Sequence, residues 1–392
     1  MTATVVRARP VGAVWLPLLA APVAMANNSP GLVLGVMGED LGTSGATTAW
    51  VVTAFGLGLA VGTPLAGHLI RGRGARVALL VSAAFVLVGT ILLVAAPSFG
   101  VVVAGRAVQA FGGSGMMVVA INAAGTAGRA GLVTAGAGVG GALGPIVGLV
   151  VTSATSWHVA LGLGAVTLLT VPALASRLPD AAPGATRFDV TGAGLFIALV
   201  LALVLSTRFS AAAVVAVAAV VPLVLWVRAR PEGFVPIALV RSRPYLLACG
   251  LILVLATGYF FLLYRVPAVL RAAGWDSGHI GLAQLVLLLA GSFLSLVFAA
   301  NSDRFGRHRV VVGMVVLAAA AQVLGLLVGA DPLLPVLGLG VAVLAMVSAQ
   351  AVLMITGTER LSEAHRPVAV GLYSLFFQLG GAFGPMFAAL LS

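Results

Sequence analysis

The 392-residue chain contains no lysine and few charged residues of any kind, since charged side chains make up 8% of it. A soluble domain carries about 25% charged residues and about 45–50% apolar ones, whereas this chain is 61% hydrophobic. A water-soluble fold of this size cannot hide so much apolar surface. The single cysteine, Cys249, excludes a disulfide framework and a Cys-based metal site. We therefore expect an integral membrane protein.

Long apolar runs dominate what is present. A helix needs about 20 apolar residues to cross the ~30 Å hydrocarbon core of a bilayer. Charges and Pro/Gly-rich breaks divide the chain into about 13 such runs: 12–36, 46–70, 77–96, 99–125, 131–153, 158–175, 189–207, 210–227, 244–268, 279–300, 309–329, 333–357 and 367–391. Strands are excluded because the runs are long and do not alternate. Arg7 and Arg9 imitate a signal peptide, but the length of the first run predicts a retained span.

The arginines predict the orientation of these spans. With the N-terminus in the cytoplasm, the outer loops hold only Arg208 and Arg271, and the inner loops hold most of the others. This is the positive-inside pattern of a multi-pass protein. Because the arginines are spread over alternate loops, they form no continuous stripe that could bind nucleic acid. The lysine-free, Ala-, Gly- and Val-rich composition suggests a GC-rich bacterial gene, and hence a bacterial inner membrane.

Two segments of the chain recur. Residues 140–145, GGALGP, return as residues 380–385, GGAFGP, and the arginine-rich loop 71–76 returns at 303–309. The offsets of 240 and 232 residues indicate one duplicated unit. Two membrane halves with a site between them are typical of secondary transporters. We expect an all-α fold with a six-helix bundle in 1–176, a linker and an inserted helix pair in 177–243, and a five-helix bundle in 244–392. The last helix is thus missing from the protein, or the sequence is a truncated product.

Five motifs lie in order along the chain. They are the loop Asp303-Arg304-Phe305-Gly306-Arg307 with a first copy in 67–76, the run from Arg106 through Gln109 to Gly112, the glycine-rich run 136–148, the segment Trp50 to Phe55, and the segment Phe188 to Gly192. Together they resemble the major facilitator superfamily, and within it the drug:proton antiporters of the 14-helix type. The chain departs from that pattern at Arg71, where the family carries Asp, and at Ala26, where many relatives carry an acid in the first helix.

The resemblance implies a cytoplasmic latch between helices. The residues that match it are Arg71, Arg73, Gly74, Asp303, Arg304, Gly306 and Arg307. Asp303 is the obvious ion-pair partner among these arginines. Positive-inside charge and a tight turn at Gly306 explain the same loop without a latch. In the first half, Arg71 cannot take the role of Asp, so its three arginines fit topology signals better.

Small residues recur at every fourth position of the glycine-rich run. The residues of this antiporter-like motif are Gly136, Gly140, Gly144, Pro145 and Gly148, with Gly384 and Pro385 in the second copy. Small residues at this spacing let helices approach closely, and proline permits a bend. Simple packing and a bend that sets antiport geometry are both compatible with this pattern.

Several polar and aromatic residues interrupt the apolar runs and are candidates for a substrate cavity. Arg106 is the only charge in its run, and a cation there costs at least about 2.5–3.5 kcal/mol unless it faces a cavity or a partner. A structural arginine bonded to backbone carbonyls is the alternative. The full set is Asn27, Asn28, Arg106, Gln109, Tyr259, Phe260, Tyr264, Gln284, Gln350, Tyr373, Phe377 and Gln378. Helix–helix hydrogen bonds for the asparagines and an interfacial aromatic belt for Tyr264 remain alternatives.

These features favour a secondary transporter that exports a lipophilic small molecule by alternating access in exchange for protons. None of the ten acids lies in the middle of a span, and Glu359 is the candidate proton carrier. Neutral or anionic substrates fit Arg106 better than dicationic ones. An uncoupled facilitator or uptake carrier, and a transport-inactive sensor or scaffold, are the alternatives. We expect no metal site, because no histidines pair at ligand spacing. We also expect a monomer with no cofactor and no enzyme chemistry.

Overall fold

The computed structural model describes residues 12–179, 188–206, 209–326 and 333–390; the side chains of residues 46, 127, 277, 296–305, 307, 308, 389 and 390 are outside the description. In the first part of the chain the helices are α1 (Trp15–Asn28), η1 (Ser29–Leu32), α2 (Leu34–Asp40), α3 (Gly45–Thr48), α4 (Trp50–Val94), α5 (Phe99–Ala124), α6 (Ala127–Ala154), α7 (Trp157–Leu161), η2 (Gly162–Thr170) and α8 (Val171–Ala175). The second part contains α9 (Val190–Leu205), α10 (Ser210–Ala229), α11 (Ile237–Arg241), α12 (Arg243–Ala272), α13 (Ser277–Phe305), α14 (Arg307–Leu326), α15 (Leu333–Thr358) and α16 (Arg366–Leu390).

Ten of the described helices are long and apolar enough to cross a membrane. The 45-residue α4 makes two passes, because it reverses at Gly74, where the backbone has φ +85° and ψ 163°. Only glycine adopts this conformation without strain. When α4 is counted as two passes and the shorter α1 and α9 are added, the described chain makes thirteen passes, as the sequence predicts. The predicted all-α membrane fold is therefore confirmed.

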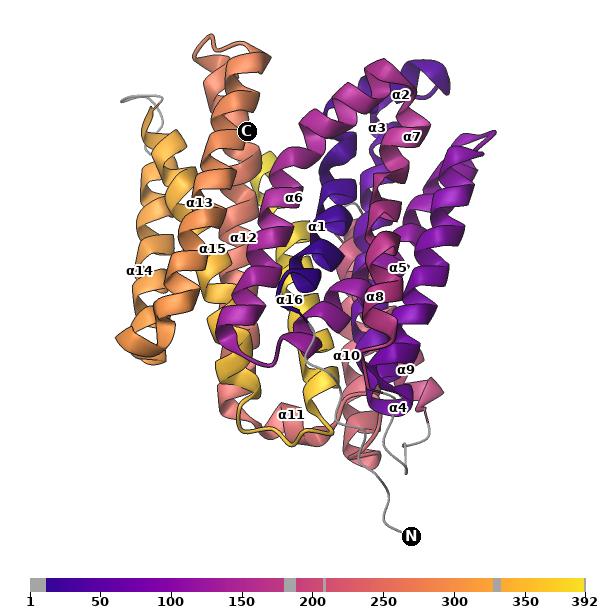
Figure 1. Cartoon of the computed structure of the whole chain (residues 1–392), viewed down its shortest axis with the longest axis vertical. Helices are drawn as coiled ribbons and strands as arrows, with labels where there is room; N and C mark the ends of the chain where they lie inside the picture. Colours follow the sequence, from indigo (N-terminus) through magenta and orange to yellow (C-terminus); the bar gives the residue numbers. More distant parts are fainter. Residues whose placement is uncertain (1–11, 180–187, 207–208, 327–332, 391–392) are drawn as a thin grey trace.

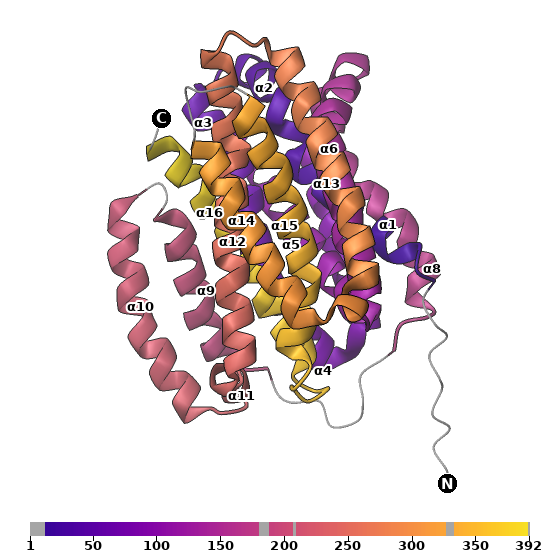
Figure 2. The same cartoon turned by 90° about the vertical axis from the view of Figure 1, so that its left-hand side faces the viewer.

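The helices form one elongated bundle, in which the axes of the long helices are roughly parallel (Figure 1). We call α1 to α8 the first half and α12 to α16 the second half. The pair α9 and α10 stands at one side of the molecule (Figure 2), where α9 contacts α4 and α16. Large apolar side chains such as Val214, Val217 and Val221 of α10 are exposed, which suits acyl chains rather than water. The protein is thus a multi-pass membrane protein.

The repeated sequence corresponds to a repeated helix contact. A Cβ atom added to Gly140 or Gly144 of α6 would lie 2.1 or 2.6 Å from backbone oxygens of α1. In the second half, a Cβ added to Gly380 or Gly384 of α16 would lie 2.5 Å from side-chain atoms of α12. Small residues therefore allow α1 to approach α6, and α12 to approach α16, at equivalent positions.

The remaining motif residues extend this contact. Gly136 meets Pro17 of α1 and Gly148 meets Ser29 of η1, so the four glycines contact α1 and the segment directly after it at four-residue steps. Pro145 lies inside α6 and Pro385 lies inside α16. Gly306, the counterpart of Gly74, also has a positive φ of +80°. The proposed limits of the two bundles and the inserted pair stay a prediction.

Candidate functional site

Arg106 of α5 is completely buried, with no exposed surface. Its guanidinium carbon lies 4.0 Å from the centre of the Phe55 ring of α4. Its Nη1 donates a hydrogen bond to Oε1 of Gln109, one turn further along α5, at 3.2 Å. The positive charge is thus held by an aromatic face and one neutral amide.

Gln109 connects this arginine to two other helices. Its Nε2 donates to the hydroxyl of Thr90 on the second arm of α4 and to the carbonyl of Leu161 on α7, both at 3.1 Å. Gly89 lets α4 approach α5 closely, because a Cβ added there would lie 2.3 Å from the backbone nitrogen of Gln109. These contacts orient the Gln109 amide so that its oxygen faces Arg106.

Two of the three guanidinium nitrogens, Nε and Nη2 of Arg106, have no hydrogen-bond partner among the described residues. The buried polar side chains of the described chain include no carboxylate. Unsatisfied buried donors cost about 1–3 kcal/mol each, and more when they carry charge. Ala26 of α1, at the position where the family resemblance implies an acid, is buried in one cluster with Phe55. The unsatisfied donors of Arg106 therefore favour an anion at this site.

The other cavity candidates divide into three groups. Asn28 donates to the carbonyl of Gly141 on α6 at 2.9 Å and accepts from Asn27 within α1 at 3.1 Å, so the Asn28 amide joins α1 to α6. Likewise, Gln284 Nε2 donates to the carbonyl of Leu263 at 3.0 Å.

Aromatic residues form the second group. Tyr259 and Phe260 of α12 lie with ring centres 4.8 Å apart, and Phe260 lies 5.7 Å from Phe377 of α16. Tyr264 is exposed, with 52% of its surface accessible. The structure therefore brings Tyr259, Phe260 and Phe377 together, whereas Tyr264 is an exposed side chain.

The third group lies between α15 and α16. Tyr373 is buried, and its hydroxyl donates to the backbone carbonyl of Gln350 at 2.9 Å. Gln378 is partly buried on α16. Tyr373 thus fastens α16 to α15.

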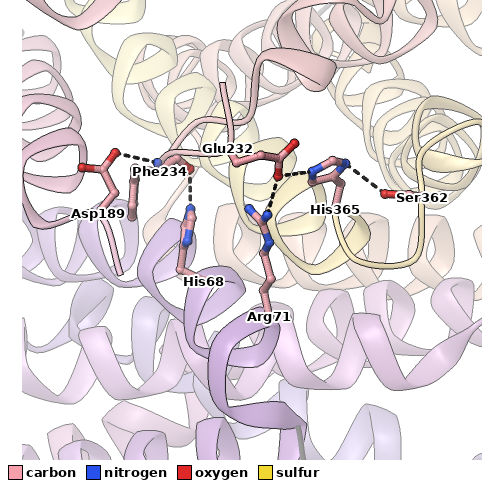
Figure 3. A network of polar contacts seen from close by, with 7 residues as sticks. All are labelled: His68, Arg71, Asp189, Glu232, Phe234, Ser362 and His365. Carbon is pink, nitrogen blue, oxygen red and sulfur yellow. Dashed lines mark hydrogen bonds and ion pairs between the residues drawn. The ribbon is translucent and has the colours of Figure 1, made fainter. Parts of the chain in front are cut away.

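A polar network lies at the end of the molecule that carries Gly74, which we call the Gly74 end (Figure 3). Arg71 of α4 donates from Nη2 to Oε2 of Glu232 at 2.6 Å. The same oxygen accepts from Nε2 of His365 at 3.0 Å, and Ser362 lies 2.9 Å from the other ring nitrogen of His365. Glu232 follows α10, whereas Ser362 and His365 precede α16. The network therefore joins the first half, the inserted segment and the second half.

Hydrogen bonds and nearby charges favour the ionised form of two acids in Figure 3, Glu232 and Asp189. The hydrogen bond from His365 lowers the pKa of Glu232 below its ordinary value of 4.5; slight burial opposes this effect, and Arg71 adds to it. Burial raises the pKa of Asp189, but hydrogen bonds from Gly192, Phe234 and Trp226 outweigh it and lower the pKa below 3.8. Both carboxylates are therefore charged at neutral pH.

The predicted latch residues are only partly described. Arg71 takes part in a contact between the two halves, Arg73 is exposed, and Gly74 makes the turn. The side chains of Asp303, Arg304 and Arg307 lie outside the described residues. Glu359, the candidate proton carrier, is exposed just after the end of α15.

Sequence reasoning missed Glu232, His365 and Asp189 as members of this network. One signal was present: Glu232 is the only acid between Asp189 and Asp276, and it lies in a predicted inner loop with Arg228 and Arg230. An arginine at the usual acidic position, Arg71, requires an acidic partner elsewhere. Within the described ranges, no group of three or more His, Cys, Asp or Glu side chains is placed so that it could hold a metal ion.

The sequence profile of the Major Facilitator Superfamily matches residues 16–269 and 246–392. The chain belongs to the major facilitator superfamily. It is also 28% identical over 179 residues to YfiU of Bacillus subtilis (strain 168), an uncharacterized MFS-type transporter. This match covers 43% of the chain and 35% of that protein, so the chain spans about a third of the length of this curated relative.

The fold of this superfamily member also resembles a solved structure. The crystal structure of the human organic anion transporter MFSD10 (TETRAN) superposes with a TM-score of 0.64 and 18% identity, over 96% of this chain and 92% of that one. The likeness extends over nearly the whole of both chains. At this identity it shows a shared fold, the fold expected for the superfamily.

Proposed function

We propose that this superfamily member is a secondary transporter that exports a lipophilic small molecule by alternating access, in exchange for protons. The duplicated halves and the family membership support transport. The inserted pair α9 and α10, which begins at the Phe188 to Gly192 motif, supports assignment to the 14-helix drug:proton antiporter group. The arginine pattern supports a bacterial inner membrane with the N-terminus in the cytoplasm. We expect the transporter to act as a monomer.

The observation that carries the proposal is the buried Arg106. A guanidinium with Nε and Nη2 unsatisfied attracts a carboxylate, a phosphate or a similar anion. Phe55 and the apolar residues around it suit the rest of a lipophilic molecule. The absence of a buried carboxylate from the described residues removes the usual partner of a dicationic drug. Neutral or anionic lipophilic compounds are therefore the preferred substrates.

The contacts between the halves support alternating access. Gly67 of α4 packs against Pro367 of α16, and Gly371 of α16 packs against Thr63 of α4, because a Cβ added to either glycine would lie within 2.8 Å of a backbone oxygen. These contacts lie near the network at the Gly74 end, whereas the ribbons of α6 and α13 draw apart towards the opposite end (Figure 1). With the Gly74 end in the cytoplasm, these contacts join the two halves on the inner side of the membrane.

Proton exchange requires a carboxylate that is protonated outside and releases its proton inside. Glu359 is the candidate, with Asp303 as the second. The exposed position of Glu359 gives it access to the inner solution, so release inside is direct. Replacing Glu359 with Gln, and Asp303 with Asn, tests the two assignments separately.

Transport into proteoliposomes tests the proposal. The compounds are a lipophilic carboxylic acid, its neutral amide and a dication of similar size, each driven by an imposed pH gradient. We expect transport of the acid and the amide but not of the dication. Arg106→Gln lowers transport of the acid about 10- to 100-fold, since a hydrogen bond to a charged group contributes about 1.5–3 kcal/mol. Arg271→Gln, at an exposed position, is the matched control.

Three outcomes contradict parts of the proposal. Equal transport of the acid by Arg106→Gln and the wild type removes the anion site. Transport that is unchanged when the pH gradient is collapsed favours the uncoupled carrier, which Ala26 in place of an acid already suggests. No transport of any compound favours the sensor or scaffold.

A further inference from the structure

The inserted helix pair contributes an unexpected contact between the two halves. Glu232, in the loop after α10, binds Arg71 of the first half and His365 of the second. The Arg71 and His365 side chains are 7% and 14% exposed, whereas Glu232 is 61% exposed. The carboxylate therefore covers the nearly buried Arg71 guanidinium and His365 ring from the solvent side.

Asp189 holds the Glu232 loop in place. As the N-cap of α9, Asp189 accepts from the backbone of Gly192 at 2.9 Å. It also accepts from the indole nitrogen of Trp226 on α10 at 3.0–3.1 Å and from the backbone nitrogen of Phe234 at 2.9 Å. One carboxylate thus fixes the start of α9, the end of α10 and the residue two positions after Glu232.

Two glycines make room for this arrangement. A Cβ added to Gly192 would lie 2.2 Å from Oδ2 of Asp189, and one added to Gly233 would lie 2.6 Å from the same oxygen. Any other residue at position 192 or 233 displaces the carboxylate. The segment Phe188 to Gly192, which begins the inserted pair, therefore helps to position the loop after α10 that carries Glu232.

The first half contacts the same loop from the other side. The His68 ring of α4 stacks on the Phe234 ring with centres 4.2 Å apart, and its Nε2 contacts the Phe234 carbonyl. Phe234 is thus held between Asp189 and α4. Since Arg71 is one turn from His68 on α4, Glu232 is brought directly over Arg71 (Figure 3).

We propose that the inserted helix pair acts as a clip that holds the Gly74 end closed. In this clip, Glu232 joins the two halves and Asp189 is its positioning residue. The clip replaces a latch that the first-half loop cannot form with an acid of its own, because Arg71 stands at the acidic position. It goes beyond the proposed function, since it does not depend on the transported compound or on protons.

The energetics suit a contact that breaks in every transport cycle. An exposed ion pair contributes about 0.2–1 kcal/mol, so it biases the closed state without locking it. Loss of this contribution raises the ratio of open to closed molecules by up to about fivefold.

The test measures distances between the halves at the Gly74 end. Spin labels are placed on Arg73→Cys and Arg360→Cys, both exposed positions, while the native Cys249 is buried and resists labelling. Distance distributions are recorded by pulsed electron paramagnetic resonance in lipid nanodiscs. The variants are Glu232→Gln and Asp189→Asn, and the exposed Glu363→Gln in the same loop as His365 is the matched control.

We expect Glu232→Gln and Asp189→Asn to increase the long-distance population about two- to fivefold, and Glu363→Gln to leave it unchanged. Asparagine keeps a helix cap for Gly192 but loses one carboxylate oxygen, so α9 stays folded while the loop is released. An unchanged distribution in Glu232→Gln overturns the clip. A shift in Glu232→Gln without one in Asp189→Asn reduces Asp189 to a helix cap and overturns its positioning role.

Discussion

Replacing Arg106 with methionine distinguishes a functional arginine from a structural one. Methionine has a similar length, is unbranched and adapts to irregular apolar space. The variant loses the hydrogen bond to Gln109, about 1.5–3 kcal/mol, and the interaction with Phe55, about 2 kcal/mol when desolvated. Methionine carries no charge, so the variant is also relieved of the desolvation penalty of the buried arginine, which amounts to several kcal/mol per ion.

The balance favours the variant. Apolar residues that replace buried ions are neutral or stabilising by about 1–4 kcal/mol. The gain falls at the upper part of this range when the ion has few partners, and Nε and Nη2 of Arg106 have none among the described residues. We therefore expect Arg106→Met to unfold at a temperature several degrees higher than the wild type in detergent, while transport of the lipophilic acid is lost.

The assay is thermal unfolding followed by tryptophan fluorescence, together with transport in proteoliposomes. Arg106→Lys keeps a buried charge and serves as the control, with no expected stabilisation. A double-mutant cycle with Phe55→Leu measures how much of the effect belongs to the ring. A fall of more than a few degrees in Arg106→Met refutes the reasoning, because it makes Arg106 a structural residue whose contacts outweigh its desolvation.

Two further predictions concern packing and pH. Gly140→Ala lowers the free energy of unfolding by about 1–3 kcal/mol because the added Cβ meets the α1 backbone. Gly194→Ala, whose added Cβ faces open space inside helix α9, does not lower it; equal unfolding temperatures contradict the close α1–α6 contact. Because the pKa of Glu232 is lowered in the folded state, its contribution to the clip is complete above pH 4.5 and is lost as the pH falls through the lower folded value. Arg71 and His365 face it, and the charge of Arg71 binds the carboxylate more strongly than the neutral acid. The spin-label distance should therefore stay constant from pH 7 to about 5 and lengthen below; lengthening near neutral pH assigns the contact to another group.

Much of the architecture was predictable because it depends on local and repeated features. The apolar runs predicted thirteen passes, and the structure has them, although Gly74 joins the second and third into one helix with a reversal. The glycine repeats predicted a close helix contact and its second copy, and they lie at α1–α6 and α12–α16. The sixth pass differs from a regular helix, since η2 is a 3₁₀ segment of nine residues between α7 and α8.

The partners of individual side chains were not predictable. Burial of Arg106 followed from its apolar run, but the lack of a carboxylate partner among the described residues depends on α1 and α4, which bring Ala26 and Phe55 to the site. Arg71 was interpreted as a topology signal because its own loop offers no acid. Its partner Glu232 lies 161 residues away.

The sequence by itself determined the membrane environment, the number of passes and the duplication, because hydropathy and small-residue spacing act through each helix and its lipid surroundings. Only the tertiary structure decided which charges meet. Ion pairs need their atoms within a few ångströms, and Glu232 reaches Arg71 and His365 only after three segments far apart in the chain have packed together.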